Sequence, residues 1–292
     1  MSLQLLFNLL ITSSIYALIA FSFSLIYSVT KFFNIAHAII ISIGGYFTFI
    51  LFILLHITIW IAVPVAIIFS SLIGLLIELI SYKHLRKKRI SPLLMLIASL
   101  GIYIVLQNCI SLLWGDDMKS LETGDIRVGH ELLGAYLTNI QIITILVCFS
   151  SFLISVIFIR FHKIGKKIRA VSANDELAKI QGINSENVIL WAVGIGSALA
   201  SIVGILVGSD TGLTPTMGFS LLLYGVVSMI IGGVGSNWGI IGGALLLAAA
   251  QHLTAYCIDS KWMDAITYII LILFLLWKPL GFSGKRLKKI EI

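Results

Sequence analysis

Long apolar runs, broken by short polar segments, set the pattern of this chain of 292 residues. A transmembrane helix needs about 20 consecutive apolar residues. Runs of that length lie at 3–28, 35–55, 57–80, 91–113, 140–160 and 187–208, and further ones lie between 219 and 278. Glycines and polar residues interrupt the last stretch, which makes its spans harder to count. The pattern predicts an all-α, polytopic transmembrane bundle of about eight to nine spans with interrupted helices.

A polar segment at residues 160–187 separates two of these runs. It carries six basic side chains, namely Arg160, Lys163, Lys166, Lys167, Arg169 and Lys179. Ser172 followed by Asp175 resembles a capping box and predicts a helix start, and Gly182 predicts the end of that helix. A helix of about nine residues would place Leu177 and Ile180 on one face. Two interpretations remain open: a surface helix that docks on another protein, or an ordinary connector.

Charge placement predicts the orientation of the chain in a membrane. Basic residues gather at 82–90, at 160–187 and in the tail from Lys278, whereas the segment at 114–139 is rich in acids. Since positively charged loops stay in the cytoplasm, we expect the basic segments inside the cell, and the acidic segment and the N-terminus outside. Glu78, at a span end beside the first basic segment, is expected to extend its carboxylate to the interface.

Residue patterns that hold cofactors or metals are absent from the sequence. The three cysteines have no CxxC spacing, and the six histidines lack metal-ligand spacing. The chain has no GxxxxGK[ST] phosphate loop and no HExxH or paired carboxylates within a span. We therefore expect no catalytic residues, no metal, no cofactor and no enzyme activity. Aromatic residues are not interleaved with the basic ones, so nucleic acid is not an expected partner, whereas membrane lipid is.

Asn34 and His37 open the second apolar run and share one helix face. Polar groups inside a bilayer are costly, and they usually have a function. A helix that starts at membrane depth would aim free backbone N–H groups at a carboxylate. The alternative interpretation is structural: Asn34 caps the helix, and His37 hydrogen-bonds a neighbouring helix.

Glycines cluster near the start of the last apolar stretch. The glycine-rich turn comprises Gly232, Gly233, Gly235 and Ser236. These residues would permit a sharp break between two half-helices that line a cavity, and we expect the break at 233–238. Gly235, Gly239 and Gly243 are also spaced by four, which is the pattern of closely packed helices.

Several blocks of sequence together resemble one known family. They are NIAHA at 34–38 with GGY at 44–46, IGKKIRAVSANDELAKIQGIN at 164–184, SALA at 197–200 followed by Gly204, Pro215 with Met217-Gly218, and IGGVGSNWGIIGGALLL at 231–247. The chain resembles the permease subunits of bacterial branched-chain amino acid ABC importers of the LIV type, a family that also includes urea and amide permeases. The resemblance covers nearly the whole chain, so we expect residues 1–292 to form a single transmembrane permease domain.

The resemblance implies a complex in the bacterial inner membrane. Its other members would be a second permease subunit, two cytoplasmic ATPase subunits that bind the ATP, and a periplasmic substrate-binding protein. The segment at 160–187 would dock on an ATPase, because it is similar to the EAA loop of ABC importers, although its proline-containing end is absent. Glu176, Ala178 and Gly182 match that pattern, and Leu177 stands in place of its middle alanine. With Ile180, these residues form the expected ATPase-coupling loop. Asn34, His37 and the glycine-rich turn would line the translocation path.

The first motif departs from the family pattern. Family members commonly read N-[FL]-A-H-G-[DE], whereas this chain has Ala38 for the glycine and Ile39 for the acid. Leucine, isoleucine and valine are the expected substrates, and urea, short amides or another amino acid are the alternatives. An ATP-independent secondary transporter or channel is less favoured, because such proteins usually carry intramembrane ionisable residues or a selectivity ring.

Overall fold

The computed structural model describes residues 3–121, 129–132, 134–278 and 280–283. Among these residues, eight helices are long and apolar enough to cross a membrane, and Met217–Gly232 is a shorter apolar helix. The prediction of an all-α, polytopic bundle is therefore confirmed. The basic tail beyond residue 283 and the acids at 122 and 125 lie outside the described residues.

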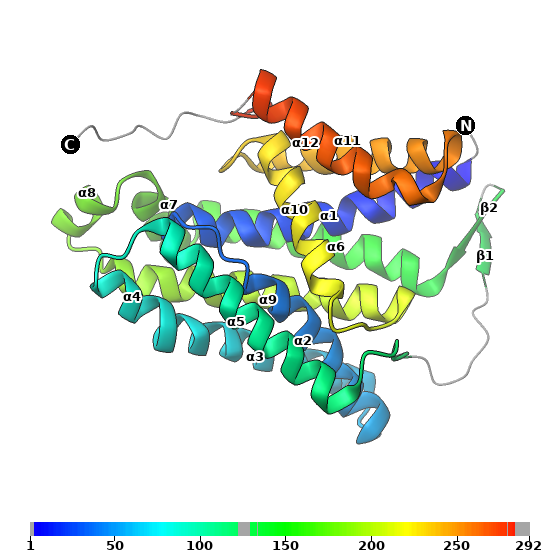
Figure 1. The fold of residues 1–292 in the computed structure, drawn as a ribbon, viewed down its shortest axis with the longest axis horizontal. Helices are drawn as coiled ribbons and strands as arrows, with labels where there is room; N and C mark the ends of the chain where they lie inside the picture. The colour runs from blue at the N-terminus through cyan, green and yellow to red at the C-terminus, as the bar shows by residue number, and fades with distance from the viewer. Residues whose placement is uncertain (1–2, 122–128, 133, 279, 284–292) are drawn as a thin grey trace.

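The elements follow one another as a bundle of long helices with two short polar helices and one hairpin (Figure 1). The long helices are α1 (Leu3–Thr30), α2 (His37–Phe49) with the π-helical turn η1 (Ile50–Leu54), α3 (Ile59–Ile77) with η2 (Glu78–Tyr82) and α4 (Lys83–Lys87), α5 (Pro92–Trp114), α6 (Asn139–Phe161), α9 (Ser185–Thr211), α10 (Met217–Gly232), α11 (Asn237–Cys257), and α12 (Met263–Trp277) with the 3-10 turn η3 (Ser260–Trp262). The short elements are α7 (Lys163–Ala173) and α8 (Asp175–Ile180), and the antiparallel strands β1 (Gly129–Leu132) and β2 (Ala135–Thr138).

The polar elements separate to the two ends of the bundle. α4 and α8, from the two described basic segments, lie at one end, and the β-hairpin and the N-terminus lie at the other (Figure 1). This separation agrees with the orientation predicted from the charges. We call the two ends cytoplasmic and external accordingly.

Helix starts in the bundle follow local sequence signals. The Thr138 side chain accepts a hydrogen bond from the backbone N–H of Gln141, and the Gln141 side chain accepts one from the backbone of Thr138. This reciprocal capping box starts α6. Ser91 followed by Pro92 starts α5, because proline at the first helical position has no N–H to satisfy.

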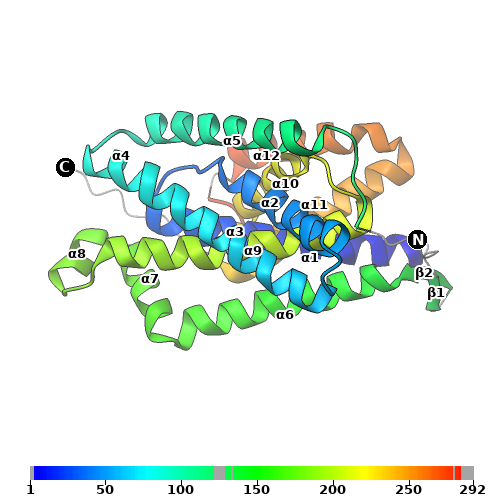
Figure 2. The ribbon, with the colours of Figure 1, turned by 90° about the horizontal axis from the view of Figure 1, so that it is seen from below.

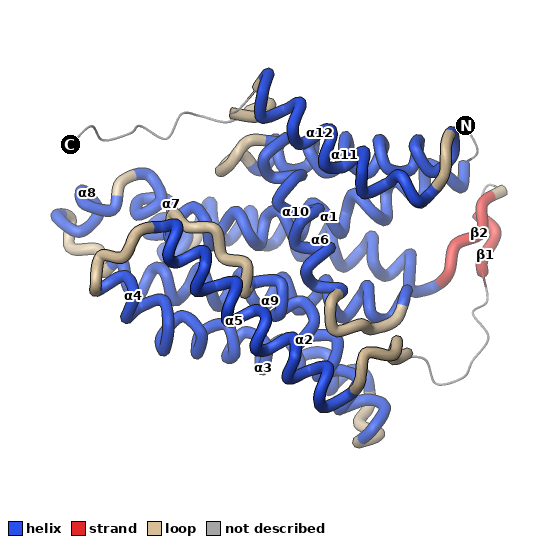
Figure 3. Tube along the Cα trace, in the orientation of Figure 1, coloured by secondary structure: helices blue, strands red, loops and turns tan. Residues whose placement is uncertain are grey.

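Two chain reversals enter the bundle instead of staying at its surface (Figure 3). After α1, the first re-entrant segment (residues 31–36) runs back among the helices, with Phe32 and Ala36 buried. After α9, the second re-entrant segment (residues 212–216) does the same, and Leu213 is fully buried. The helices α2 and α10 therefore start inside the bundle, from opposite ends.

α2 and α10 cross near their starts. The Ser42 hydroxyl accepts a hydrogen bond from the backbone N–H of Gly218 at 3.2 Å and donates one to the carbonyl of Pro215 at 3.3 Å. A Cβ atom at Gly218 would lie 2.1 Å from the carbonyl oxygen of Ala38, so the crossing requires glycine there. Two helix N-termini, each the positive end of a helix dipole, thus meet inside the bundle.

The unit α1–α3 and the unit α9–α11 repeat one arrangement in opposite orientations. The long helix α1 packs on α9, α10 and α11, and the long helix α9 packs on α1, α2 and α3. In each unit the re-entrant segment follows the long helix, which is α1 or α9. The next helix, which is α2 or α10, packs against the long helix of the other unit. Seen from below, α3 lies next to α9 and α5 (Figure 2). Each long helix therefore packs against the re-entrant helix of the other unit, α1 against α10 and α9 against α2.

Candidate functional site

The predicted docking segment (residues 160–187) contains two short helices, so the predicted start at Ser172 is wrong. Ser172 lies inside α7, whose residues Ile168 and Val171 are buried against the bundle and extend that helix to its end. The next helix starts after Asn174, which has an extended backbone and accepts a hydrogen bond from the N–H of Leu177 at 3.0 Å. The buried face of α7 decides this boundary, and the spacing of Ile164, Ile168 and Val171 by four and three was the available signal.

The end of α8 at Gly182 is confirmed. Gly182 has a φ of 79°, and its N–H donates to the carbonyl of Lys179 at 2.9 Å. The N–H of Ile183 donates to the carbonyl of Ala178 at 3.0 Å. These bonds form the glycine-terminated helix end that satisfies the last carbonyls. α8 is six residues long instead of about nine, because the residues before Asn174 belong to α7.

α8 has one buried and one exposed face. Ala178 is 2% exposed and packs in the main hydrophobic core, whereas Leu177 and Ile180 are 58% and 81% exposed. Glu176 is also exposed. Neighbouring exposed apolar side chains on a polar surface are typical of protein interaction sites. The geometry suits the predicted docking role of Leu177 and Ile180, which stays a prediction.

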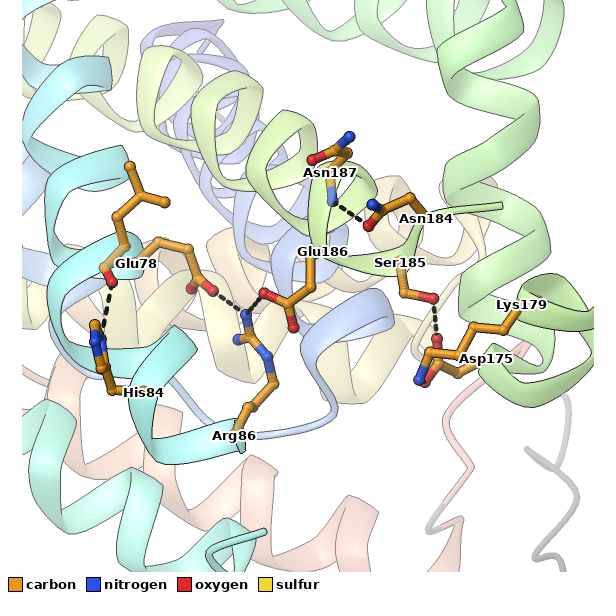
Figure 4. Close-up of polar contacts among 10 residues, drawn as sticks. Glu78, His84, Arg86, Asp175, Lys179, Asn184, Ser185, Glu186 and Asn187 are labelled. Carbon is orange, nitrogen blue, oxygen red and sulfur yellow. Dashed lines mark hydrogen bonds and ion pairs between the residues drawn. The ribbon is translucent and has the colours of Figure 1, made fainter. Parts of the chain in front are cut away.

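Asp175, the first residue of α8, ties this helix to the start of α9 (Figure 4). Its carboxylate accepts hydrogen bonds from the hydroxyl of Ser185 and, at 2.6 Å, from Nζ of Lys179. Burial alone would raise the pKa of Asp175, but the hydrogen bonds from Lys179 and Ser185 outweigh it, and the pKa lies below its ordinary value. The carboxylate is therefore held as an anion.

Arg86 of α4 lies between two acids at the same end (Figure 4). Its Nη2 pairs with Oε1 of Glu78 and lies 3.5 Å from Oε2 of Glu186 in α9. Glu78 is 1% exposed, so the expectation that its carboxylate reaches the interface is wrong. The helix continues from α3 through η2 into α4, which brings Arg86 back over Glu78 and supplies a partner for the buried charge.

Asn34 does not cap α2, so that interpretation is wrong. The residue before α2 is Ala36, with no side-chain cap, and the Asn34 side chain is directed elsewhere. Its Oδ1 accepts a hydrogen bond from the hydroxyl of Tyr82 in η2 at 2.7 Å, and both residues are buried. Asn34 therefore fixes the first re-entrant segment to the cytoplasmic end of α3.

His37 is buried and bonds a neighbouring helix, as the structural interpretation predicted. Its Nε2 lies 2.6 Å from the hydroxyl of Ser22 in α1, which also donates to the carbonyl of Gly196 in α9 at 3.1 Å. Asn34, His37 and Ser197 line one cavity of about 10 Å³. Such a space holds at most a single water molecule. Passage of a substrate beside Asn34 and His37 therefore requires these helices to separate.

The glycine-rich turn breaks the chain where predicted. α10 ends at Gly232 and α11 starts at Asn237, and Gly233 and Gly235 have φ values of 97° and 83°. The Ser236 hydroxyl caps α11 by accepting from the N–H of Gly239 at 3.1 Å. The structure does not bring this turn to the cavity of Asn34 and His37. Instead, the backbone carbonyls at its start accept hydrogen bonds from residues 282 and 283.

The spacing of Gly235, Gly239 and Gly243 does not form one packing face. A Cβ atom at Gly239 would lie 2.0 Å from the carbonyl oxygen of Gly232, and one at Gly243 would lie 2.1 Å from that of Ser228, so these two glycines let α10 and α11 pack closely. At Gly235 a Cβ atom would meet no described residue within 4 Å other than its two neighbours in the chain. Gly235 serves the turn, and the packing prediction holds for the other two glycines only.

The polar contacts between α12 and the rest of the bundle were not predicted from the sequence. The Tyr16 hydroxyl donates to Oε1 of Gln251 at 2.7 Å, and Nε2 of Gln251 donates to the hydroxyl of Thr267 at 2.7 Å. The Tyr224 hydroxyl donates to Oδ1 of Asp264 at 2.5 Å. These bonds join α1, α10 and α11 to the otherwise exposed α12. A glutamine within the apolar run of α11 was the available signal.

Comparison with known proteins decides the family. A family model described as "Branched-chain amino acid transport system / permease component" matches residues 5–275. The chain belongs to this family. It is therefore a multi-pass membrane protein and a component of a transporter complex, in a family of transport permeases rather than of enzymes.

Named relatives of this permease match it over nearly its full length. The high-affinity branched-chain amino acid transport system permease protein LivH of Escherichia coli strain K12 is 33% identical, over 97% of this chain and 96% of its own. The corresponding permease protein BraD of Pseudomonas aeruginosa is 32% identical over the same shares. A probable permease LivH of Methanocaldococcus jannaschii is 25% identical over 97% of this chain and 92% of its own.

Proposed function

We propose that this permease moves leucine, isoleucine and valine across the inner membrane of a bacterial cell, driven by separate ATPase subunits. The observation that carries the proposal is the match of 33% identity over 97% of the chain to a relative named for branched-chain amino acid transport. A match of this extent includes the helix crossing, the docking segment and the glycine-rich turn together.

The proposed complex contains a second permease subunit, two cytoplasmic ATPase subunits and a periplasmic binding protein. The ATPase subunits bind ATP, and this chain holds no cofactor. α8 would insert Leu177 and Ile180 into a groove on an ATPase, since both side chains are exposed while Ala178 anchors the helix to the bundle. Recognition of a helix by a groove relies on a few apolar anchors of this kind.

Transport would follow from movement of the docked helix. Closure of the ATPase subunits would displace α7 and α8, and the spans would rock between inward and outward access. The cavity of about 10 Å³ beside Asn34 and His37 would have to open in that movement. Once it is open, the N-termini of α2 and α10 would present positive dipole ends to the carboxylate of an amino acid.

The proposal is tested by uptake of radiolabelled leucine into proteoliposomes that contain the permease with its co-expressed partners. We expect uptake that requires ATP, the ATPase subunits and the binding protein, and that excess isoleucine or valine suppresses. The purified chain alone should hydrolyse no ATP. Uptake by the chain without ATP contradicts the proposal, and suppression by urea or acetamide but not by valine would reassign the substrate.

A further inference from the structure

The first two residues of α9 bridge the docking helix and the cytoplasmic end of α3 (Figure 4). Ser185 donates to the carboxylate of Asp175 in α8, and its neighbour Glu186 pairs with Arg86 of α4 at 3.5 Å. Because Ser185 and Glu186 are adjacent, a shift of α8 is passed through one helix end to α4. The charge of Arg86 also acts on Asp175 directly and favours its anionic form.

Arg86 is in turn fixed to the membrane-spanning helix. Its partner Glu78 is 1% exposed, and a buried carboxylate without a cation is strongly unfavourable, so this pair stays together. Tyr82 lies between these two residues in the same helix, and its hydroxyl holds Oδ1 of Asn34 at 2.7 Å. A displacement of Arg86 therefore reaches the first re-entrant segment through Tyr82.

A second link joins the same two regions. Lys31, at the start of the re-entrant segment, donates from Nζ to the carbonyl of Ser172 in α7 at 2.7 Å. The segment is thus attached at Lys31 to α7 and at Asn34, through Tyr82, to the helix that carries Arg86. Both attachments lead to the docking end of the chain.

Arg86 also has unused hydrogen-bonding capacity. Nη2 of Arg86 contacts the carboxylates of both Glu78 and Glu186. Its Nε and Nη1 are buried and have no hydrogen-bond partner among the described residues. Buried donors without a partner are uncommon in folded proteins. A planar guanidinium can bind a carboxylate through two nitrogens, so a small shift of α9 would give Glu186 a two-nitrogen contact.

From these contacts we propose that Arg86 is a positioning residue, which couples movement of α8 to the first re-entrant segment through Glu186 and Tyr82. The inference rests on the proposed function, because it concerns how ATPase movement reaches the translocation path. Arg86 touches no substrate in this role. Its ion pair with Glu186 has two arrangements, through one nitrogen or through two, and the position of α8 favours one of them.

Glu186→Gln tests this role most cleanly, because it leaves the buried pair of Glu78 and Arg86 intact. Glu186 is 40% exposed, and an exposed ion pair contributes at most about 1 kcal/mol, so the variant should fold normally. In the assembled transporter we expect ATPase co-purification and ATP hydrolysis to be unchanged, while substrate transported per ATP falls about fivefold. Lys87→Gln, which removes an exposed charge from the same helix, should keep the wild-type ratio.

A second comparison uses Asp175→Asn alone and together with Glu186→Gln. If both acids act through Arg86, the double variant should lose no more coupling than the worse single variant. An unchanged transport-to-ATP ratio in Glu186→Gln, loss of the ATPase from that variant, or additive losses in the double variant would each overturn the inference. If the wild-type complex fails to transport, the proposed function fails as well, which separates the two cases.

Discussion

The Tyr82 hydroxyl donates to Oδ1 of Asn34 across 2.7 Å, from the π-helical end of α3 to the chain reversal that precedes α2. The two residues stand 48 positions apart in the sequence. Their bond holds an irregular stretch of backbone at membrane depth, where irregular backbone is tolerated only inside the protein or along a cavity.

Tyr82→Phe removes the hydroxyl and leaves the side-chain volume almost unchanged. We therefore expect this variant to be less stable than the wild-type permease. Loss of the hydroxyl leaves the buried amide oxygen of Asn34 without its donor, at a cost of about 1 kcal/mol. Thermal unfolding in detergent should show a melting temperature lower by a few degrees. Tyr256→Phe, at an exposed tyrosine, is the matched control and should change nothing. Equal melting temperatures for all three proteins would contradict the assigned bond.

Gly218→Ala should disrupt the crossing of α2 and α10. The added methyl group would lie 2.1 Å from the carbonyl oxygen of Ala38, and backbone cannot move away as a flexible side chain can. We expect little folded protein by fluorescence-detected size-exclusion chromatography. Gly242→Ala adds the same group where it meets no described residue of another element within 4 Å, and it should be neutral or slightly stabilising. Normal yield and transport with Gly218→Ala would be incompatible with the crossing.

Orientation is tested by labelling single cysteines in a background without Cys109, Cys148 and Cys257. The variants are Ser120→Cys and Lys166→Cys. Ser120 follows α5 and is next to Lys119, which pairs with Leu213 just after α9, and Lys166 lies on α7. A membrane-impermeant maleimide added to intact spheroplasts should label the first and reach the second only after permeabilisation. Labelling of both from the periplasmic side would place the docking segment on the wrong side for an ATPase.

Sequence reasoning was accurate where the signal is local. The spans follow from apolar runs, the end of α8 from Gly182, and the break after Gly232 from a cluster of glycines that adopt positive φ. Each of these features depends on a few consecutive residues and on backbone sterics. The re-entrant segments were only partly visible, because Asn34 suggested a helix start at depth without showing that the chain doubles back.

Contacts between distant residues were not predictable in the same way. The pairing of Arg86 with Glu186 and the bond of Tyr16 to Gln251 depend on which helices become neighbours, and one sequence does not reveal that. Packing between elements, which local propensity does not include, determines both contacts. The wrong helix start at Ser172 has a different cause, because the spacing of Ile164, Ile168 and Val171 already favours a helix that runs through Ser172.

Docking of α8 on an ATPase subunit is the central claim, and co-purification tests it most directly. Leu177→Asp puts a charge into the proposed apolar anchor, and Met118→Asp puts the same charge on an exposed apolar residue at the external end. With permease levels matched, we expect Leu177→Asp to release the ATPase and abolish transport, and Met118→Asp to retain the ATPase. Recovery of equal ATPase with wild-type and Leu177→Asp permease would show that α8 is only a connector.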